Sequence, residues 1–249
     1  MSRHIAFLSD IHGNLTALQA VLSDIQARGI TEIYFLGDIL GRGPAVHELI
    51  SLIRTHCKAA VYGNWDTGIL NDPDHSNPIY TYYTSRMTQE EIDWLLSLPE
   101  TLELDFCGHS MIAYHGRQSV SRIYIPTFAS DQTDLDAALE RFGRHDLTIL
   151  GDAHHAYHVV RKGQRMIGIG AVGTPTDGLP LASYLIVHGD ENGGMLSTEQ
   201  VRVRYDIEKE VSRALHTPDL PFLSDYITEI STGYYCRKAR DAYYAGRQK

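Results

Sequence analysis

The sequence predicts an α/β fold in which two β-sheets are flanked by helices, and three observations carry that prediction. Short apolar runs alternate with stretches of helical spacing up to about residue 150, an order typical of parallel strands joined by helical crossovers. Between residues 158 and 205 the apolar runs are closely spaced with little helical pattern between them, which indicates a second sheet. Helical spacing returns from Asp206 onward.

The first half begins with a short apolar run, residues 5–8, that ends at Ser9 and indicates a buried strand. Apolar positions at helical spacing follow from Leu15 to Ile25, and Gly29 is a typical stop signal. The alternation continues with predicted strands over 33–36, 59–62, 111–114 and 147–150. Helices are predicted over 46–53 and 134–142, and a third begins at a capping box at 88–91 and ends before Pro99. Residues 71–84 are polar, contain proline and are rich in tyrosine, so we expect a loop or an irregular flap there.

The second half predicts strands and then helices. The strands are expected over 158–161, 166–169, 183–187 and 200–205, with a hairpin loop at 190–194. The sequence contains no repeat, linker or low-complexity segment. We therefore expect a single domain over residues 1–249, with C-terminal helices at about 206–249 packed on it.

Composition restricts the classes of function. The net charge of −9 argues against a surface that coats nucleic acid, because an acidic protein repels a polyanion at long range. The three cysteines are scattered and form no CxxC pair, which indicates a reducing compartment. The apolar stretch before Asp10 is too short for a signal peptide, and no stretch approaches the roughly 20 apolar residues of a membrane-spanning helix. We expect a soluble, cytoplasmic protein with no membrane partner.

Potential metal ligands follow the ends of five predicted strands. A lone Gly-Asp at such a place most often caps the next helix, but capping gives no reason for three histidines in the set. Carboxylate, amide and imidazole groups without thiolates suit Mn²⁺, Fe²⁺ or Zn²⁺. Seven ligands are too many for one tetrahedral ion and suit two ions that share a bridging carboxylate. The seven candidates are Asp10, His12, Asp38, Asn64, His115, Asp152 and His154.

The order of these motifs resembles the calcineurin-like metallophosphoesterase superfamily. The resemblance rests on Asp10-x-His12, Gly37-Asp38, Gly63-Asn64-x-Asp66, His115-Gly116 and a final Gly-x-x-His that ends at His154. Residues 88–99, 170–175, 177–178, 182–184 and 205–207 extend it to a bacterial and archaeal branch of phosphodiesterases and diadenosine tetraphosphatase-like proteins.

This resemblance implies a four-layer αββα sandwich of two mixed sheets. It also implies hydrolysis of a phosphodiester, a phosphomonoester or a dinucleoside polyphosphate by a hydroxide that bridges two divalent metals. By position, Asp10, His12 and His154 would bind the first metal, Asp38 would bridge, and Asn64 and His115 would bind the second.

Two positions depart from the family pattern. Trp65 stands where a histidine often serves as general acid, and an indole N–H cannot donate a proton at neutral pH. Asp152 stands in place of a histidine, so an oxygen ligand at the second metal would favour Mn or Fe, with Zn or Ni as other options. Alternatively, Asp152 is not a ligand and His155 takes that place. The same departures motivate an alternative function, a metal- or nucleotide-binding regulator that has lost turnover.

Arg42 resembles the phosphate-clamping arginine of the protein-phosphatase branch in Gly-Asp-x-x-x-Arg-Gly, and with Asn64 it would stabilise charge on phosphorus. Its alternative role is a surface arginine that caps a helix start beside Pro44.

Tyr80, Tyr82 and Tyr83 would border the site, where base stacking by them is a hypothesis. The tail, residues 234–249, is expected to form a helix that packs on the domain or on a partner subunit, so a homo-oligomer stays open. We expect a small phosphorylated substrate, with a nucleotide as one option, and loops 70–87 and 117–132 as the place of specificity.

Overall fold

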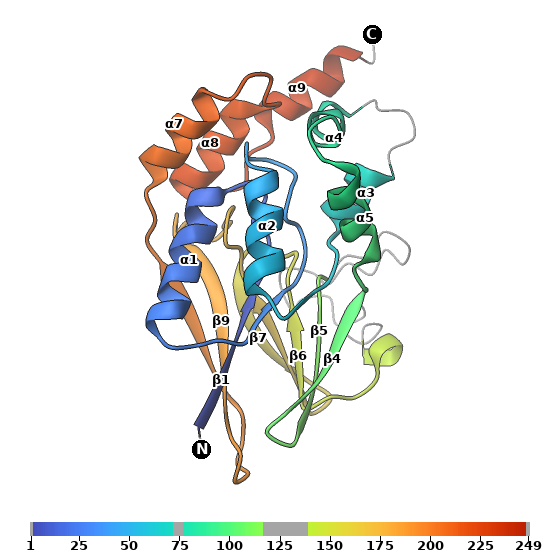
Figure 1. Ribbon diagram of the computed structural model, residues 1–249, viewed down its shortest axis with the longest axis vertical. Helices are drawn as coiled ribbons and strands as arrows, with labels where there is room; N and C mark the ends of the chain where they lie inside the picture. The colour runs from blue at the N-terminus through green and yellow to red at the C-terminus, as the bar shows by residue number, and fades with distance from the viewer. Residues whose placement is uncertain (1, 72–76, 117–138, 248–249) are drawn as a thin grey trace.

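The computed structural model describes residues 2–71, 77–116 and 139–247 and has two five-stranded mixed sheets (Figure 1). The first has the order β10-β9-β1-β2-β3 and the second β4-β5-β6-β8-β7. Their strands are β1 (Ser2–Leu8), β2 (Ile33–Phe35), β3 (Ala59–Ala60), β4 (Thr101–Phe106), β5 (His109–Tyr114), β6 (Leu147–Leu150), β7 (Ala156–Arg161), β8 (Gln164–Ile169), β9 (Ala182–Asp190) and β10 (Ser197–Val203). The predicted fold class is confirmed, but the strands expected over 183–187 and 200–205 belong to the first sheet, where β9 pairs with β1 and β10 with β9.

The two sheets pack face to face around a shared apolar core. Phe7 and Leu185 of the first sheet lie in one buried cluster with Met111 and Ile149 of the second. Helices cover the other face of the first sheet, and their apolar sides form a second, larger cluster with it. These helices are α1 (Leu15–Ala27), α2 (His47–His56), α3 (Asn64–Leu70), α4 (Pro78–Thr84), α5 (Gln89–Ser97), α7 (Ile207–Leu215) and α8 (Leu223–Thr232).

Parallel pairing brings several strand ends to one end of the molecule. β1 pairs in parallel with β2, and β2 with β3, while β5 pairs in parallel with β6. The carboxyl ends of these strands therefore point the same way, toward the end that also carries α7, α8 and α9 (Lys238–Arg247) in Figure 1. Ligands in α/β proteins gather at this edge.

The expectation of an irregular flap over 71–84 is wrong for its second part, which is helix α4. Asn77 caps this helix by accepting from the Ile79 N–H, and Pro78 occupies its first turn, where no N–H partner is needed. The hydroxyls of Tyr82 and Tyr83 donate to backbone carbonyls of Pro44 and Gly43, and both rings are buried. These two tyrosines are thus part of the core and are not available for base stacking, which corrects the hypothesis for them, while for Tyr80, which lines the cavity described below, it stays a prediction.

Other differences concern the ends of elements. The strand predicted over 59–62 pairs only at Ala59 and Ala60, and strand β4 was not predicted, because its alternating pattern is short. Residues 139–142 of the helix predicted over 134–142 are helical, and 134–138 lie outside the described residues, as does the loop 117–132. No helix in the described part of the chain combines the length and apolar character that a membrane crossing needs.

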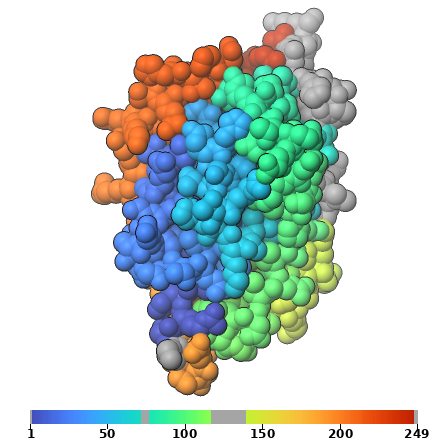
Figure 2. Space-filling model, in the orientation of Figure 1, coloured from blue at the N-terminus to red at the C-terminus, as the bar shows by residue number. Residues whose placement is uncertain are grey.

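The C-terminal helices are attached to the rest of the fold by a buried carboxylate. Glu210 of α7 accepts from the backbone N–H and the hydroxyl of Thr16 in α1, at 3.1 and 2.6 Å, and from the Tyr226 hydroxyl in α8 at 3.0 Å. Its side chain is fully buried, so loss of these donors would leave an unsatisfied charge. In the space-filling view the orange surface of these helices adjoins the helices at residues near 50 and 80 (Figure 2).

Candidate metal centre

All seven predicted ligands follow the carboxyl ends of parallel strands. Asp10 and His12 follow β1, Asp38 follows β2, and Asn64 begins the helix after β3. In the second sheet, one ligand candidate follows β5 and two follow β6; these are His115, Asp152 and His154. Backbone hydrogen bonds join the first two loops, since the Asp10 N–H donates to Gly37 and the His12 N–H to Asp38.

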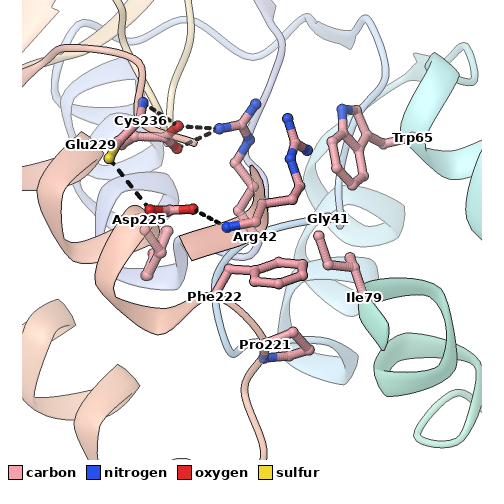
Figure 3. A pocket seen from close by; sticks show the side chains of 11 residues that line it. Gly41, Arg42, Trp65, Ile79, Pro221, Phe222, Asp225, Glu229 and Cys236 are labelled. Atoms are coloured by element: carbon pink, nitrogen blue, oxygen red, sulfur yellow. Dashed lines mark hydrogen bonds and ion pairs between the residues drawn. The ribbon is translucent and has the colours of Figure 1, made fainter. Parts of the chain in front are cut away.

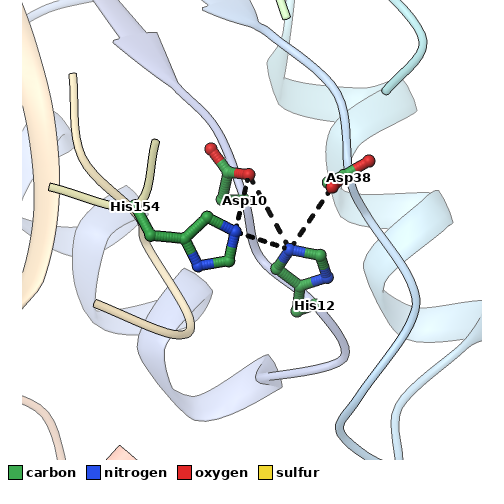
Figure 4. Close-up of side chains that lie close together, drawn as sticks. All are labelled: Asp10, His12, Asp38 and His154. Atoms are coloured by element: carbon green, nitrogen blue, oxygen red, sulfur yellow. Dashed lines mark hydrogen bonds and ion pairs between the residues drawn. The ribbon is translucent and has the colours of Figure 1, made fainter. Parts of the chain in front are cut away.

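Four of these residues form one compact cluster. Ligand atoms of Asp10, His12, Asp38 and His154 all lie within 4.8 Å of one another (Figure 4). Asp10 Oδ1 lies 3.2 Å from His154 Nε2 and 3.7 Å from His12 Nε2. This group could hold one divalent cation.

The other three candidates lie on the far side of Asp38. Asp38 Oδ2 is 3.4 Å from His12 Nε2 and 3.3 Å from His115 Nε2, so this oxygen lies between the two groups. His115 Nε2 is also 3.0 Å from Asn64 Oδ1 and 3.7 Å from Asp152 Oδ1. The arrangement could hold a second cation, with Asp38 shared.

Hydrogen bonds orient all three imidazoles with Nε2 toward the carboxylates. The Nδ1 atoms of His12, His115 and His154 lie 3.0, 2.6 and 2.7 Å from the backbone carbonyls of Leu40, Leu36 and Thr174. A carbonyl oxygen only accepts, so each Nδ1 carries a hydrogen and each ring directs Nε2 at the cluster, where a deprotonated Nε2 offers a lone pair to a cation. His12 Nε2 and His154 Nε2 are 3.1 Å apart, a distance at which two lone pairs need a proton or a metal cation to share. Metal-binding histidines typically donate their other ring N–H to a carbonyl or carboxylate oxygen, as these Nδ1 atoms do.

Two buried carboxylate oxygens lack a hydrogen-bond partner among the described residues, and they are the two that face the imidazoles. Asp10 Oδ2 accepts from the Asp152 N–H and Asp38 Oδ1 from the Trp65 N–H, whereas Asp10 Oδ1 and Asp38 Oδ2 form no hydrogen bond with a described residue and face imidazole Nε2 atoms instead. Leaving buried charged acceptors unsatisfied is costly unless a cation compensates them. The donor set and these two oxygens fit divalent metal ions.

The backbone of the site is strained. Five of the candidate ligands have left-handed φ values between 49° and 62°, a region that non-glycine residues seldom occupy. Such conformations cost free energy and are retained mainly at functional sites. The five are Asp10, His12, Asp38, Asp152 and His154.

The charges of the cluster are strongly coupled. Burial alone would raise the pKa of the Asp10 carboxyl, but His154 and His115 hold that pKa well below its ordinary value. Burial would likewise lower the pKa of His115, yet Asp38 and Asp10 raise it well above its ordinary value. The site therefore attracts positive charge, and metal binding would release the protons that the imidazoles carry.

A cavity of about 680 Å³ opens on this centre. Asn64, Asp152 and His154 line it together with Arg42 and Trp65. Its size is within the range of small-molecule sites. A second, much smaller pocket of about 20 Å³ lies beside it, and Figure 3 shows its lining.

Arg42 is held in place by a buried carboxylate. Its Nη1 donates to both oxygens of Glu229 in α8, and the guanidinium lies 5.6 Å from the ring of Trp65 (Figure 3). The Arg42 side chain is only 11% exposed, so the alternative of a surface arginine is wrong. Trp65 packs edge-on against His12, with ring centroids 5.8 Å apart, and forms a wall of the centre.

A profile of the calcineurin-like phosphoesterase superfamily domain matches residues 4–192. The chain belongs to this superfamily. The uncharacterized protein MJ0912 of Methanocaldococcus jannaschii is 34% identical to this phosphoesterase over 226 residues, which cover 82% of this chain and 89% of that protein.

Solved structures agree with this membership. A metallophosphoesterase from Sphaerobacter thermophilus is similar with a TM-score of 0.74 and 26% identity, over 93% of this phosphoesterase and 99% of that chain. The hypothetical protein PH1004 from Pyrococcus horikoshii shares the fold with a TM-score of 0.75 at 19% identity, over 94% and 99% of the two chains. Hydrolysis of a phosphoester is therefore the general activity that family membership supports.

The structure also shows residues of the phosphoesterase site that sequence reasoning missed. Glu229, which pairs with Arg42, lies 187 residues away in the chain and has no local signal. The family motif that contains Asp66 predicts no role for it, although an acid three residues after Gly63 can accept from the N–H that precedes the helix. Its buried carboxylate accepts from the N–H groups of Gly63, Asp38 and Ile39 at 2.9, 2.8 and 3.1 Å, and so holds the Asp38 loop.

Replacing Asp66 with alanine should weaken metal binding without removing a candidate ligand. Three backbone donors would lose their acceptor, and the loop of Asp38 would lose its fixed position. We expect the dissociation constant for Mn²⁺ to rise by about 10- to 100-fold, the range typical of residues that orient metal ligands. Isothermal titration calorimetry would measure it, with Asp93→Ala on the exposed side of α5 as the matched control. An unchanged constant would show that Asp66 does not position the centre.

Replacing Arg42 with methionine should destabilise the phosphoesterase because Glu229, 1% exposed, would keep a buried charge without its partner. We expect a loss of about 3–5 kcal/mol in the free energy of unfolding. Urea denaturation would measure it. The double variant Arg42→Met/Glu229→Gln should recover more than half of the loss, and a double variant as unstable as the single one would contradict the buried-pair explanation.

Proposed function

We propose that this phosphoesterase hydrolyses the ester bond of a small phosphorylated substrate, a phosphodiester, a phosphomonoester or a dinucleoside polyphosphate, by attack of water at a two-metal centre. The observation that carries the proposal is the pair of buried, unpartnered oxygens, Asp10 Oδ1 and Asp38 Oδ2, that face three oriented imidazoles. Buried carboxylate oxygens without a hydrogen bond are costly unless a cation compensates them, so this pair supports metal binding.

We assign the ligands in two groups that share one carboxylate. Asp10, His12 and His154 would hold the first cation, Asn64, His115 and Asp152 the second, and Asp38 both. The oxygen-rich second group favours Mn²⁺ or Fe²⁺, with Zn²⁺ or Ni²⁺ as further options. Two such ions, when bound, supply Lewis acidity to phosphoryl oxygens and lower the pKa of water.

The remaining polar groups would bind and orient the phosphate. Asn64 points its amide oxygen at His115, which leaves its N–H groups as donors for a phosphoryl oxygen. Arg42 uses Nη1 on Glu229, and we propose that Nη2 contacts the phosphate from the cavity wall. Trp65 excludes water on one side of the centre but provides no proton, so substrates with a weakly basic leaving group should react fastest.

Turnover of bis(p-nitrophenyl) phosphate tests the proposal. Protein treated with a chelator should be inactive, and Mn²⁺ or Fe²⁺ should restore release of p-nitrophenol. A parallel assay with p-nitrophenyl phosphate would establish the preference for diester or monoester. Absence of turnover with each of Mn²⁺, Fe²⁺, Ni²⁺ and Zn²⁺ would overturn the proposal and favour the alternative, a metal- or nucleotide-binding regulator.

A further inference from the structure

The cavity at the metal centre has a second wall that lies outside the matched family domain. The family match ends at residue 192, yet residues of the segment from 234 to 247 line the same cavity as Asn64 and His154. These residues are Tyr235, Arg237, Arg240 and Tyr244. The C-terminal segment thus takes part in forming the site.

This wall is fixed in place by hydrogen bonds to α8. The backbone N–H groups of Ala239 and Arg240 donate to the carboxylate of Asp225 at 2.9 and 3.0 Å, which joins the start of α9 to α8. Asp225 is 6% exposed, so this contact is part of the packed structure. The Cys236 N–H donates to Glu229 at 3.0 Å, so the same connection is tied to the partner of Arg42.

The side chain of Arg240 is directed toward the cavity. Its guanidinium carbon lies 5.8 Å from the centroid of the Trp65 ring, and Nη2 donates to the Tyr235 hydroxyl at 2.7 Å. Arg42 lies against the same two rings, at 5.6 Å from Trp65 and 5.0 Å from Tyr235. The two guanidinium groups are therefore neighbours on one wall.

The arginines on this wall differ in the ion pairs that their guanidinium groups form. Arg42 is paired with buried Glu229, whereas no carboxylate in the described part of the chain forms an ion pair with the Arg240 guanidinium. Arg237, which directly precedes α9, pairs with the exposed Asp241 of that helix, and a salt bridge between exposed side chains contributes little to stability. Asp152 is the one acidic residue among those that line the cavity, and it is a candidate metal ligand. In a chain of net charge −9, this wall therefore carries one guanidinium, that of Arg240, without an ion pair among the described residues, and a second, that of Arg237, with only an exposed one.

We propose that Arg237 and Arg240 form a second phosphate-binding subsite, which binds a phosphate of the substrate other than the one that is hydrolysed. This inference rests on the proposed function, which places the scissile phosphate at the metal centre. A guanidinium binds phosphate oxygens in a bidentate geometry, and two of them on one wall suit a chain of phosphates. The substrate class is therefore a phosphoester with at least one further phosphate group.

The test compares substrates that differ in the number of phosphates. Arg237→Gln/Arg240→Gln should raise the KM for diadenosine tetraphosphate by about 10- to 100-fold relative to its effect on the KM for bis(p-nitrophenyl) phosphate, since each lost contact is a charge-assisted hydrogen bond. Lys238→Gln removes one positive charge from α9 at an exposed position outside the cavity lining, and both KM values should stay within about two-fold of wild type. Arg240→Lys should retain part of the affinity because it keeps the charge.

Several outcomes would overturn the subsite. An equal rise in KM for thymidine 5′-(p-nitrophenyl) phosphate, which has a base and a single phosphate, would assign the arginines to the nucleoside. If the double variant raised KM equally for all substrates, Arg237 and Arg240 would contribute to the fold and not to a subsite. If Lys238→Gln raised KM by the same factor, the effect would come from the net charge alone.

A binding measurement separates this inference from the proposed function. Calorimetry on chelator-treated protein would compare tripolyphosphate binding to wild type and to the double variant. An affinity about 10-fold or more weaker in the variant supports the subsite even if no ester is hydrolysed. Equal affinities in a protein that does hydrolyse the diester overturn the subsite and leave the proposed function standing.

Discussion

Replacing Asp38 with asparagine should reduce kcat for bis(p-nitrophenyl) phosphate by about 10³-fold or more, because the change removes the one charge that both halves of the centre share. Asp38 Oδ2 lies 3.4 Å from His12 Nε2 and 3.3 Å from His115 Nε2, so an uncharged amide there would weaken the ligand sets of both cations. We expect the bound metal, measured by mass spectrometry of the dialysed protein, to fall from two ions to one or none.

The variant should still fold, so that the loss can be assigned to the centre. Asparagine keeps the shape of the side chain, and its oxygen can still accept from the Trp65 N–H as Asp38 Oδ1 does at 2.8 Å. Circular dichroism would establish that the fold is retained. Asp93→Asn makes the same chemical change at an exposed position of α5 and should leave kcat within about two-fold of wild type. If Asp38→Asn kept two metals and turned over at a tenth of the wild-type rate or faster, Asp38 would not be the shared ligand.

The general position of the centre could be predicted from the sequence because it depends on backbone topology. Parallel strands end at one edge of a sheet, so polar residues after each of them must meet there, and the structure brings Asp10, Asp38 and His115 together in this way. The alternation of apolar runs predicts most of the strands and helices in order, but not α3, α4 or β4. Helix α4 was missed since Asn77-Pro78 is as common in turns as at helix starts.

The surroundings of the centre could not be predicted, because they depend on contacts between distant parts of the chain. Arg42 and Glu229 are 187 residues apart, and no local pattern pairs them. The inward direction of Arg240 results from the way Asp225 holds the start of α9, which is also tertiary. Likewise, the left-handed backbone at Asp38 and Asp152 is imposed by the surrounding loops, since neither residue requires it.

The sequence leaves the last ligand of the second cation open between Asp152 and His155. The structure places Asp152 at the centre, with Oδ1 3.7 Å from His115 Nε2 and its N–H on Asp10 Oδ2 at 3.1 Å. The His155 ring instead packs near Tyr157, with ring centroids 5.9 Å apart. We therefore propose Asp152 as the ligand of the second cation.

Asp152→Ala should lower the metal content from two ions to one and reduce kcat by about 10²- to 10³-fold, since a single ion cannot stabilise both the attacking and the leaving oxygen. His155→Ala is the matched control and should keep two ions and most of the activity. The reverse pattern would make His155 the ligand.

Asp152→His restores the residue type of the family pattern. The backbone at this position is left-handed, and histidine can also adopt that conformation. Because a nitrogen donor is softer than a carboxylate, Zn²⁺ should activate this variant more than Mn²⁺ does. If the order of activation by the metals were the same as in wild type, Asp152 would not be the cause of a preference for Mn²⁺ or Fe²⁺.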